Sequence, residues 1–194
     1  MKFVSNLIVE RFMVHLQNDG YLPSDANSLL QKARDLAGQI SVTIRDSRVS
    51  SKYLEFDVSI QKDELEPLLS RLKSLGKIDH AKEVIEEEKE KKKAIDEGVF
   101  FFNNERFWEC HEVLEGVWKK CYEGEKDVVQ SIILVAAAFV HFQKAENNIC
   151  ISILQRAIEK LGNTSGMYHD IDLDKLRSKV SKIIETEEIT IFEI

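Results

Sequence analysis

Residues 103–118 read NNERFWECHEVLEGVW, and the second half of the chain is organised around this segment. At about 100° per residue it predicts an amphipathic helix with an apolar stripe along one side. His111 and Glu115 fall on that side, together with Phe107, Trp108, Leu114, Trp118 and Tyr122. Polar groups set into an apolar stripe need a partner, so this helix carries the candidate site.

The composition indicates a protein of one or two domains with a substantial core. The chain has 194 residues, of which 43% are apolar and 31% are charged. No apolar run reaches the roughly 18 residues of a membrane span, and the first residues lack the apolar block of a signal peptide. We therefore expect a cytoplasmic protein without a membrane partner. The formal net charge of −7 argues against a uniformly basic surface, so nucleic acid is not an expected partner.

The three cysteines, Cys110, Cys121 and Cys150, form no Cys-x-x-Cys pair. Cys110 and Cys121 fall on one predicted helix, about 16 Å apart, which is too far for a disulfide. We interpret the three cysteines as reduced thiols in the core.

Residues 1–85 predict a small α+β domain, because segments with strand-like alternation lie between segments with helical periodicity. The residues between the second and third strands, 46–51, are read as a hairpin connection. The order βαββα(β) is that of a ferredoxin-like unit, which hosts many functions and so predicts none. The expected strands cover residues 11–16, 40–44, 54–60 and 77–85, and the expected helices cover residues 25–37 and 63–75.

Residues 86–98 predict a charged linking helix at the domain boundary. Between residues 82 and 93, five acidic and five basic groups cancel. Glu87 with Lys91 and Glu88 with Lys92 have the i,i+4 spacing that stabilises a solvated helix. This balance favours a linker over a nucleic-acid-binding tail.

Residues 99–188 predict an all-α helical bundle, so the whole chain is α+β. The segment 127–145 is apolar nearly all round and is expected at the centre of the bundle. Residues 189–194 alternate between apolar and polar, which predicts a strand-like tail. The other expected helices cover residues 103–118, 149–161 and 172–185.

Two patterns, F-N-x3-F-x3-H-E-x-L-E-x2-W over residues 102–118 and Q-x-I-x3-A-A-x3-H over residues 130–141, resemble the family called domain of unknown function 309. The resemblance covers residues 100–161 and implies a small helical bundle, without an assigned activity. Where the family often has two glycines after the central helix, this chain has Glu146 and Cys150. The positions that match recurring polar residues of the family are Asn103, His111, Glu112, Glu115, Gln130, His141 and Asn147.

One interpretation is a buried polar network that orders the bundle of a binding module for a small molecule or a protein. His111 would then pair with Glu115, and Asn103 would cap the helix. Gln130 and His141 would bond backbone groups or each other. The candidate ligand-binding residues are Asn103, Trp108, His111, Glu112, Glu115, Trp118, Gln130 and His141.

Two other interpretations stay open. An acid–base enzyme, for example a small-molecule hydrolase, would use His111 and Glu115 as its catalytic residues. A divalent metal would be held by His111, Glu115 and His141, although His-Glu-x-x-Glu departs from the His-Glu-x-x-His motif of zinc proteases. The sequence requires no cofactor, and residues 99–102 or an exposed sheet face would serve a homodimer.

Overall fold

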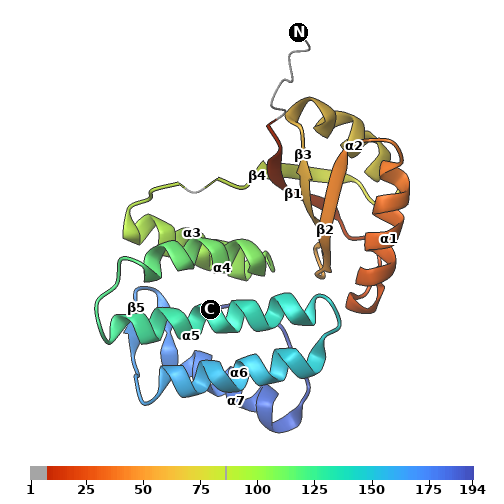
Figure 1. The fold of residues 1–194 in the computed structure, drawn as a ribbon. Coiled ribbons are helices and arrows are strands. Elements are labelled where there is room, and N and C mark those ends of the chain that lie inside the picture. Colours follow the sequence, from red (N-terminus) through yellow and green to blue (C-terminus); the bar gives the residue numbers. More distant parts are fainter. Residues whose placement is uncertain (1–7, 86) are drawn as a thin grey trace. The chain divides into compact units, whose positions relative to one another are not determined.

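The computed structural model describes residues 8–85 and 87–194, and the chain divides into two compact units, Met1–Glu86 and Glu87–Ile194. The first unit contains a four-stranded antiparallel sheet with helices, and the second is helical (Figure 1). The predicted α+β class is confirmed. Within the described residues, no helix has the length and apolar character needed to cross a membrane.

The sheet of the first unit has the strand order β2-β3-β1-β4, with every neighbouring pair antiparallel. This order, together with the fourth strand, confirms the predicted ferredoxin-like βαββα(β) arrangement. The strands are β1 (Glu10–Gln17), β2 (Val42–Val49), β3 (Tyr53–Ile60) and β4 (Ile78–Glu83), and the helices between them are α1 (Ala26–Ala37) and α2 (Leu65–Leu72).

Helices α1 and α2 pack on one face of this sheet (Figure 1). The face is apolar because every second residue of β1 and β3 points to it. Val14 of β1 lies opposite Phe56 of β3, and both are fully buried in a cluster with Leu29 of α1 and Leu68 of α2. The opposite face carries the polar residues that alternate with these.

Strand β2 is longer than the sequence pattern predicts, since it runs to Val49 and leaves only residues 50–52 for the hairpin turn. The pairing register shifts between Ile44 and Asp46. This irregularity interrupts the period-two alternation, so Asp46 and the polar residues after it resemble a loop in the sequence. The prediction that residues 46–51 form the hairpin connection is therefore wrong.

The charged linking helix expected at residues 86–98 is also corrected. Glu86 lies outside the described residues, residues 87–90 are not helical, and α3 (Lys91–Asn103) begins only at Lys91. Lys91 pairs with Glu125 at 2.5 Å, and Lys89 pairs with Glu97 at 2.5 Å. Glu88 pairs with Lys120, so the predicted partners Lys91 and Glu88 both pair outside this segment, whereas Lys93 makes a local pair with Glu90.

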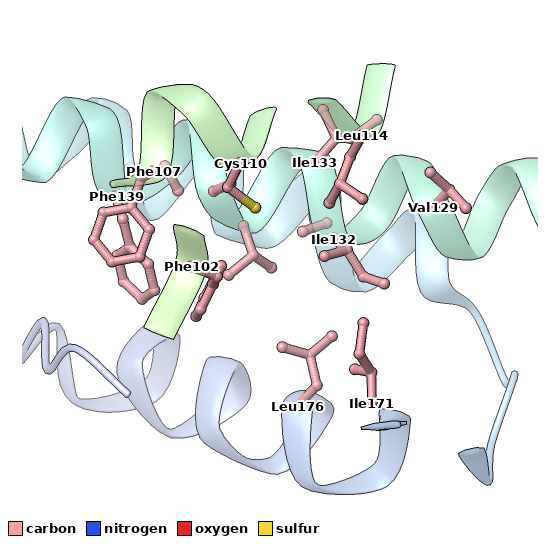
Figure 2. Packing of buried hydrophobic residues seen from close by; sticks show 14 of the residues in the cluster. Phe102, Phe107, Cys110, Leu114, Val129, Ile132, Ile133, Phe139, Ile171 and Leu176 are labelled. Atoms are coloured by element: carbon pink, nitrogen blue, oxygen red, sulfur yellow. The ribbon is translucent and has the colours of Figure 1, made fainter. Parts of the chain in front are cut away.

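The second unit is a bundle around α5 (Glu125–Phe142), which packs against α4 (Phe107–Trp118) and α6 (Asn147–Leu161). Figure 2 shows Phe107, Cys110 and Leu114 of α4 pointing toward α5. A short hairpin, β5 (Met167–Tyr168) with β6 (Ile171–Asp172), precedes α7 (Leu173–Thr186) and was not predicted.

Two boundaries in this unit differ from the sequence pattern. Asn103 ends α3, and α4 begins at Phe107, because Glu105 between them takes a left-handed backbone conformation with φ of 59°. The predicted strand at 189–194 is wrong: these residues form neither helix nor strand. Their apolar side chains pack against the helical core instead, so the alternation reflects contact with helices rather than with a sheet.

Candidate functional site

The buried stripe of α4 runs through Phe107, Cys110, Leu114 and Val117. The stripe of Trp108, His111, Glu115 and Trp118 lies one position further round the helix, at the edge of the bundle. The side chain of His111 is 26% exposed and that of Glu115 is 50% exposed. The expectation that these two groups are enclosed in the apolar stripe is therefore corrected: both side chains reach the surface.

His111 lies between two carboxylates at this surface. Its Nδ1 is 3.5 Å from Oε1 of Glu112, and its Nε2 is 3.6 Å from Oε1 of Glu115. These distances exceed those of a good N–H···O hydrogen bond. One ligand atom from each of the three residues can be chosen so that all three lie within 4.8 Å of one another.

Two half-buried indoles, Trp108 and Trp118, occupy the same side of α4 as His111. The ammonium of Lys126 lies 4.9 Å from the centre of the Trp118 ring, which is a cation–π contact. The Nε1 of Trp118 is buried and has no hydrogen-bond partner among the described residues. Along α4, Trp108 lies about one turn before His111 and Trp118 about one turn after Glu115.

His141 takes no part in that group. It lies near the end of α5, where its Nδ1 is 2.5 Å from Oε2 of Glu146. The family that this chain resembles often has glycine at the position of Glu146. The glutamate that replaces it here is the partner of His141. Gln130, also on α5, is half-buried and lies about 16 Å along the helix from His141, too far for the two side chains to bond each other.

Asn103 was predicted to cap α4, but Arg106 occupies the N-cap position of that helix. Its Nδ2 donates to the carbonyl oxygen of Ile194 at 3.2 Å, and its Oδ1 accepts from the Ile194 backbone N–H at 2.9 Å. The residue therefore holds the end of the described chain, 91 positions away in the sequence.

The helical unit also contains a polar network around Glu125 that the sequence pattern does not indicate. Glu125, at the start of α5, accepts hydrogen bonds from Lys91 at 2.5 Å and from the Tyr168 hydroxyl at 3.0 Å. Partial burial raises the pKa of Glu125, but the bonds from Lys91 and Tyr168 lower it more, so the net shift is downward. No motif marks this network, because its members come from α3, α5 and β5.

The cysteines are free and buried, which confirms the interpretation as core thiols. Gln143 is another buried polar group that the sequence did not single out. Its Nε2 donates to the carbonyl oxygen of Glu105 at 2.7 Å and so fixes the left-handed residue between α3 and α4.

Residues 95–152 match the family described as Domain of unknown function (DUF309). The matched segment runs from α3 into α6 and contains all eight candidate ligand-binding residues, so the predicted resemblance is confirmed. An "Uncharacterized protein" of Aquifex aeolicus (strain VF5) is 25% identical over 121 residues, which cover 58% of this chain and 34% of that protein. The chain thus spans about a third of the relative's length, and neither match carries an assigned activity.

Proposed function

We propose that the helical unit is a binding module that takes up a divalent metal ion on α4, through His111, Glu112 and Glu115. The observation that supports this function is the convergence of an imidazole nitrogen and two carboxylate oxygens, all within 4.8 Å of one another. Glu112 and Glu115 are 43% and 50% exposed, so an ion can reach the group from solvent.

The spacing of the ligand atoms suits a small ion. With metal–ligand bonds of about 2.1 Å at tetrahedral angles, neighbouring ligand atoms lie about 3.4 Å apart. The distance from Nε2 of His111 to Oε1 of Glu115, 3.6 Å, is close to that value. A single ion can use only one of the two ring nitrogens, and Nε2 with Glu115 has the i,i+4 spacing that brings two side chains of one helix together.

The same donor set indicates which ions would bind. Imidazole and carboxylate together suit zinc and the neighbouring first-row divalent ions better than magnesium or calcium, which take oxygen ligands alone. Three protein ligands leave at least one coordination position open. In the proposed module that position would take a group from a small-molecule or protein partner, and Trp108 and Trp118 would flank it.

An acid–base enzyme that uses His111 and Glu115 is supported less well. A general base needs one ring nitrogen directed at the substrate, with the other oriented by a carboxylate. In His111 both ring nitrogens face carboxylates, and both distances exceed 3.2 Å. This geometry favours binding of a cation over transfer of a proton.

The test is isothermal titration of the full chain, stripped of metal, with Zn²⁺, Mn²⁺ and Mg²⁺. We expect one Zn²⁺ or Mn²⁺ per chain and a rise in melting temperature that grows with the logarithm of ion concentration. His111→Ala and Glu115→Gln should each weaken binding at least tenfold.

The matched control is His141→Ala. It removes another half-exposed histidine that also pairs with a carboxylate, Glu146, outside the three-residue group. It should bind the ion as the wild type does. Binding that His111→Ala leaves unchanged, or a wild type that binds none of the three ions, would contradict the proposal.

A further inference from the structure

The group of His111, Glu112 and Glu115 on α4 is incomplete as a closed metal site. Each of the three residues offers an ion one ligand atom, and all three come from one helix. Zinc is almost always four-coordinate in closed protein sites, so one ligand is missing. Glu112 and Glu115 are exposed, and a further ligand can therefore approach the group from solvent.

Gly116 lies beside these ligands in the middle of α4, where the packing of the chain does not require a glycine. An added Cβ would meet no side chain or distant backbone of the described residues within 4 Å, whereas one at Gly98 would lie 2.8 Å from Leu114. Glycine destabilises a helix interior relative to alanine. On an exposed face, however, it lets another molecule come close to the helix. Gly116 therefore marks a face of α4 that a partner can approach.

A second copy of α4 complements this face. When two antiparallel helices pair about a twofold axis through the middle of residues 112–115, residues at equal distances from the axis lie opposite each other. Glu112 of each copy then lies opposite Glu115 of the other, and His111 lies opposite Gly116. Because glycine has no side chain, it leaves space between the helices for the imidazole and its ion.

Charge makes this pairing depend on the ion. Glu112 and Glu115 place two carboxylates on the face of each copy, so a pair of copies would bring four together. Like charges across an interface repel, which disfavours a dimer without metal. Two divalent ions offset the four negative charges, and each ion gains a ligand from the other copy. Association and ion uptake should therefore be coupled, each raising the affinity of the other.

We propose that a second copy of this chain is the partner of the metal site, in a dimer that pairs α4 with α4 and holds one ion per chain. This inference rests on the proposed function and names its partner. His111 and Glu115 of one copy bind each ion, and Glu112 of the other copy takes the open coordination position. The second oxygen of each Glu112 remains available to the ion of its own chain.

Sedimentation velocity of the full chain measures the coupling. At micromolar concentration the chain should be a monomer in EDTA and a dimer with one equivalent of Zn²⁺, which corresponds to a dimer affinity at least tenfold higher with zinc. Gly116→Gln should weaken the zinc-dependent dimer at least tenfold, because its side chain occupies the space opposite His111. The variant should stay folded, since glutamine favours a helix more than glycine does. The matched control is Ser152→Gln at an exposed position of α6, which should dimerise as the wild type does.

A mixture of two impaired variants tests whether Glu112 acts across the dimer. Glu112→Gln retains His111 and Glu115, whereas His111→Ala retains Glu112. In a mixed dimer, one complete site forms from His111 and Glu115 of one chain and Glu112 of the other. The mixture should therefore bind zinc at least tenfold more tightly than either variant alone.

The outcomes separate this inference from the function on which it rests. Zinc that binds one per chain without a dimer would overturn the inference and leave the metal site standing, with its open position free for a small molecule. A chain that binds no zinc in any form would overturn both. A dimer of equal strength in EDTA, or a zinc-dependent dimer that Gly116→Gln leaves intact, would show that the copies pair elsewhere and would overturn the inference. A mixture that binds zinc no better than its two components would also overturn it, because Glu112 would then act only within its own chain.

Discussion

The Nε2 of His15 lies 2.8 Å from Oε2 of Glu55, across directly opposed positions of β1 and β3. The other oxygen of Glu55 accepts a hydrogen bond from Nε of Arg48 on β2. Burial alone would raise the pKa of Glu55. Arg48 and then His15 lower it by more than burial raises it, and the resulting pKa is about 2. Three strands are thus joined through one ionised carboxylate.

This relationship predicts how stability depends on pH. The folded-state pKa of Glu55 is depressed from 4.5 to about 2, so the stabilisation is complete above pH 4.5 and is lost as the pH falls toward 2. The loss should be on the order of 3 kcal/mol, at about 1.4 kcal/mol per pH unit. Urea unfolding of the wild type at pH 6, 4 and 2.5 measures it.

Glu55→Gln is the comparison for that series. It should be less stable than the wild type at pH 6, because Arg48 and His15 lose an ionised partner. Its unfolding free energy should also fall less between pH 6 and 2.5. If both proteins lose the same free energy over this range, Glu55 does not titrate as the structure requires.

Helices α3 and α4 approach closely at Gly98, where an added Cβ would lie 2.8 Å from Cδ2 of Leu114. Gly98→Ala should gain about 1 kcal/mol from helix propensity, but overpacking costs about 1–3 kcal/mol. We expect net destabilisation in the wild type. In a Leu114→Ala background the same change should stabilise, because the obstructing side chain is gone.

A double-mutant cycle on the unfolding free energy measures this coupling, which should be at least about 1 kcal/mol. Leu114→Ala alone should cost about 2–5 kcal/mol, as expected for a buried leucine. Additive effects of the two substitutions would show that Leu114 moves aside freely and that Gly98 is not required by the packing.

Trp118 offers a different kind of test, because its Nε1 is buried without a hydrogen-bond partner in the described part of the chain. An unsatisfied buried donor costs about 1–3 kcal/mol, which phenylalanine would recover while giving up some apolar contact. Trp118→Phe should therefore change the melting temperature little, whereas Trp118→Leu should lower it. A large loss in Trp118→Phe would mean that the indole N–H has an acceptor after all.

The sequence predicted the order of elements better than the face of α4. Strand alternation and helical periodicity sufficed for the βαββα(β) unit and the helical bundle. On α4, however, Phe107-Cys110-Leu114-Val117 and Trp108-His111-Glu115-Trp118 have the same spacing, one residue out of phase. The predicted stripe combined members of both sets. Only the first set lies in the core, where α3 approaches closely at Gly98.

Parts of the site depend on contacts between distant segments, which local patterns do not reveal. The role of Asn103 depends on Ile194, and that of Glu125 depends on Lys91 and Tyr168. The sequence marked Asn103 only as a recurring family position. Its partner is a backbone, which leaves no signature in residue types.

The three thiols provide a further prediction. Burial raises the pKa of Cys110 far above its usual range and that of Cys150 to about 12. Burial and then the Glu125 carboxylate raise the pKa of Cys121, although Lys91 opposes the shift. Since the thiolate is the nucleophile, iodoacetamide at pH 8 should modify none of the three at an appreciable rate in the native protein, and all three after unfolding in guanidinium.

Glu125→Gln distinguishes the causes of these shifts. In this variant no carboxylate charge offsets the Lys91 ammonium, which lowers the Cys121 pKa. The Cys121 pKa should therefore fall, and its labelling should accelerate. Cys110 and Cys150, whose shifts come from burial alone, should stay unreactive. Peptide mapping by mass spectrometry assigns the label to each cysteine. Equal acceleration at all three would indicate that the substitution loosens the whole bundle, whereas selective labelling of Cys121 would show that Glu125 suppresses thiolate formation at that one site.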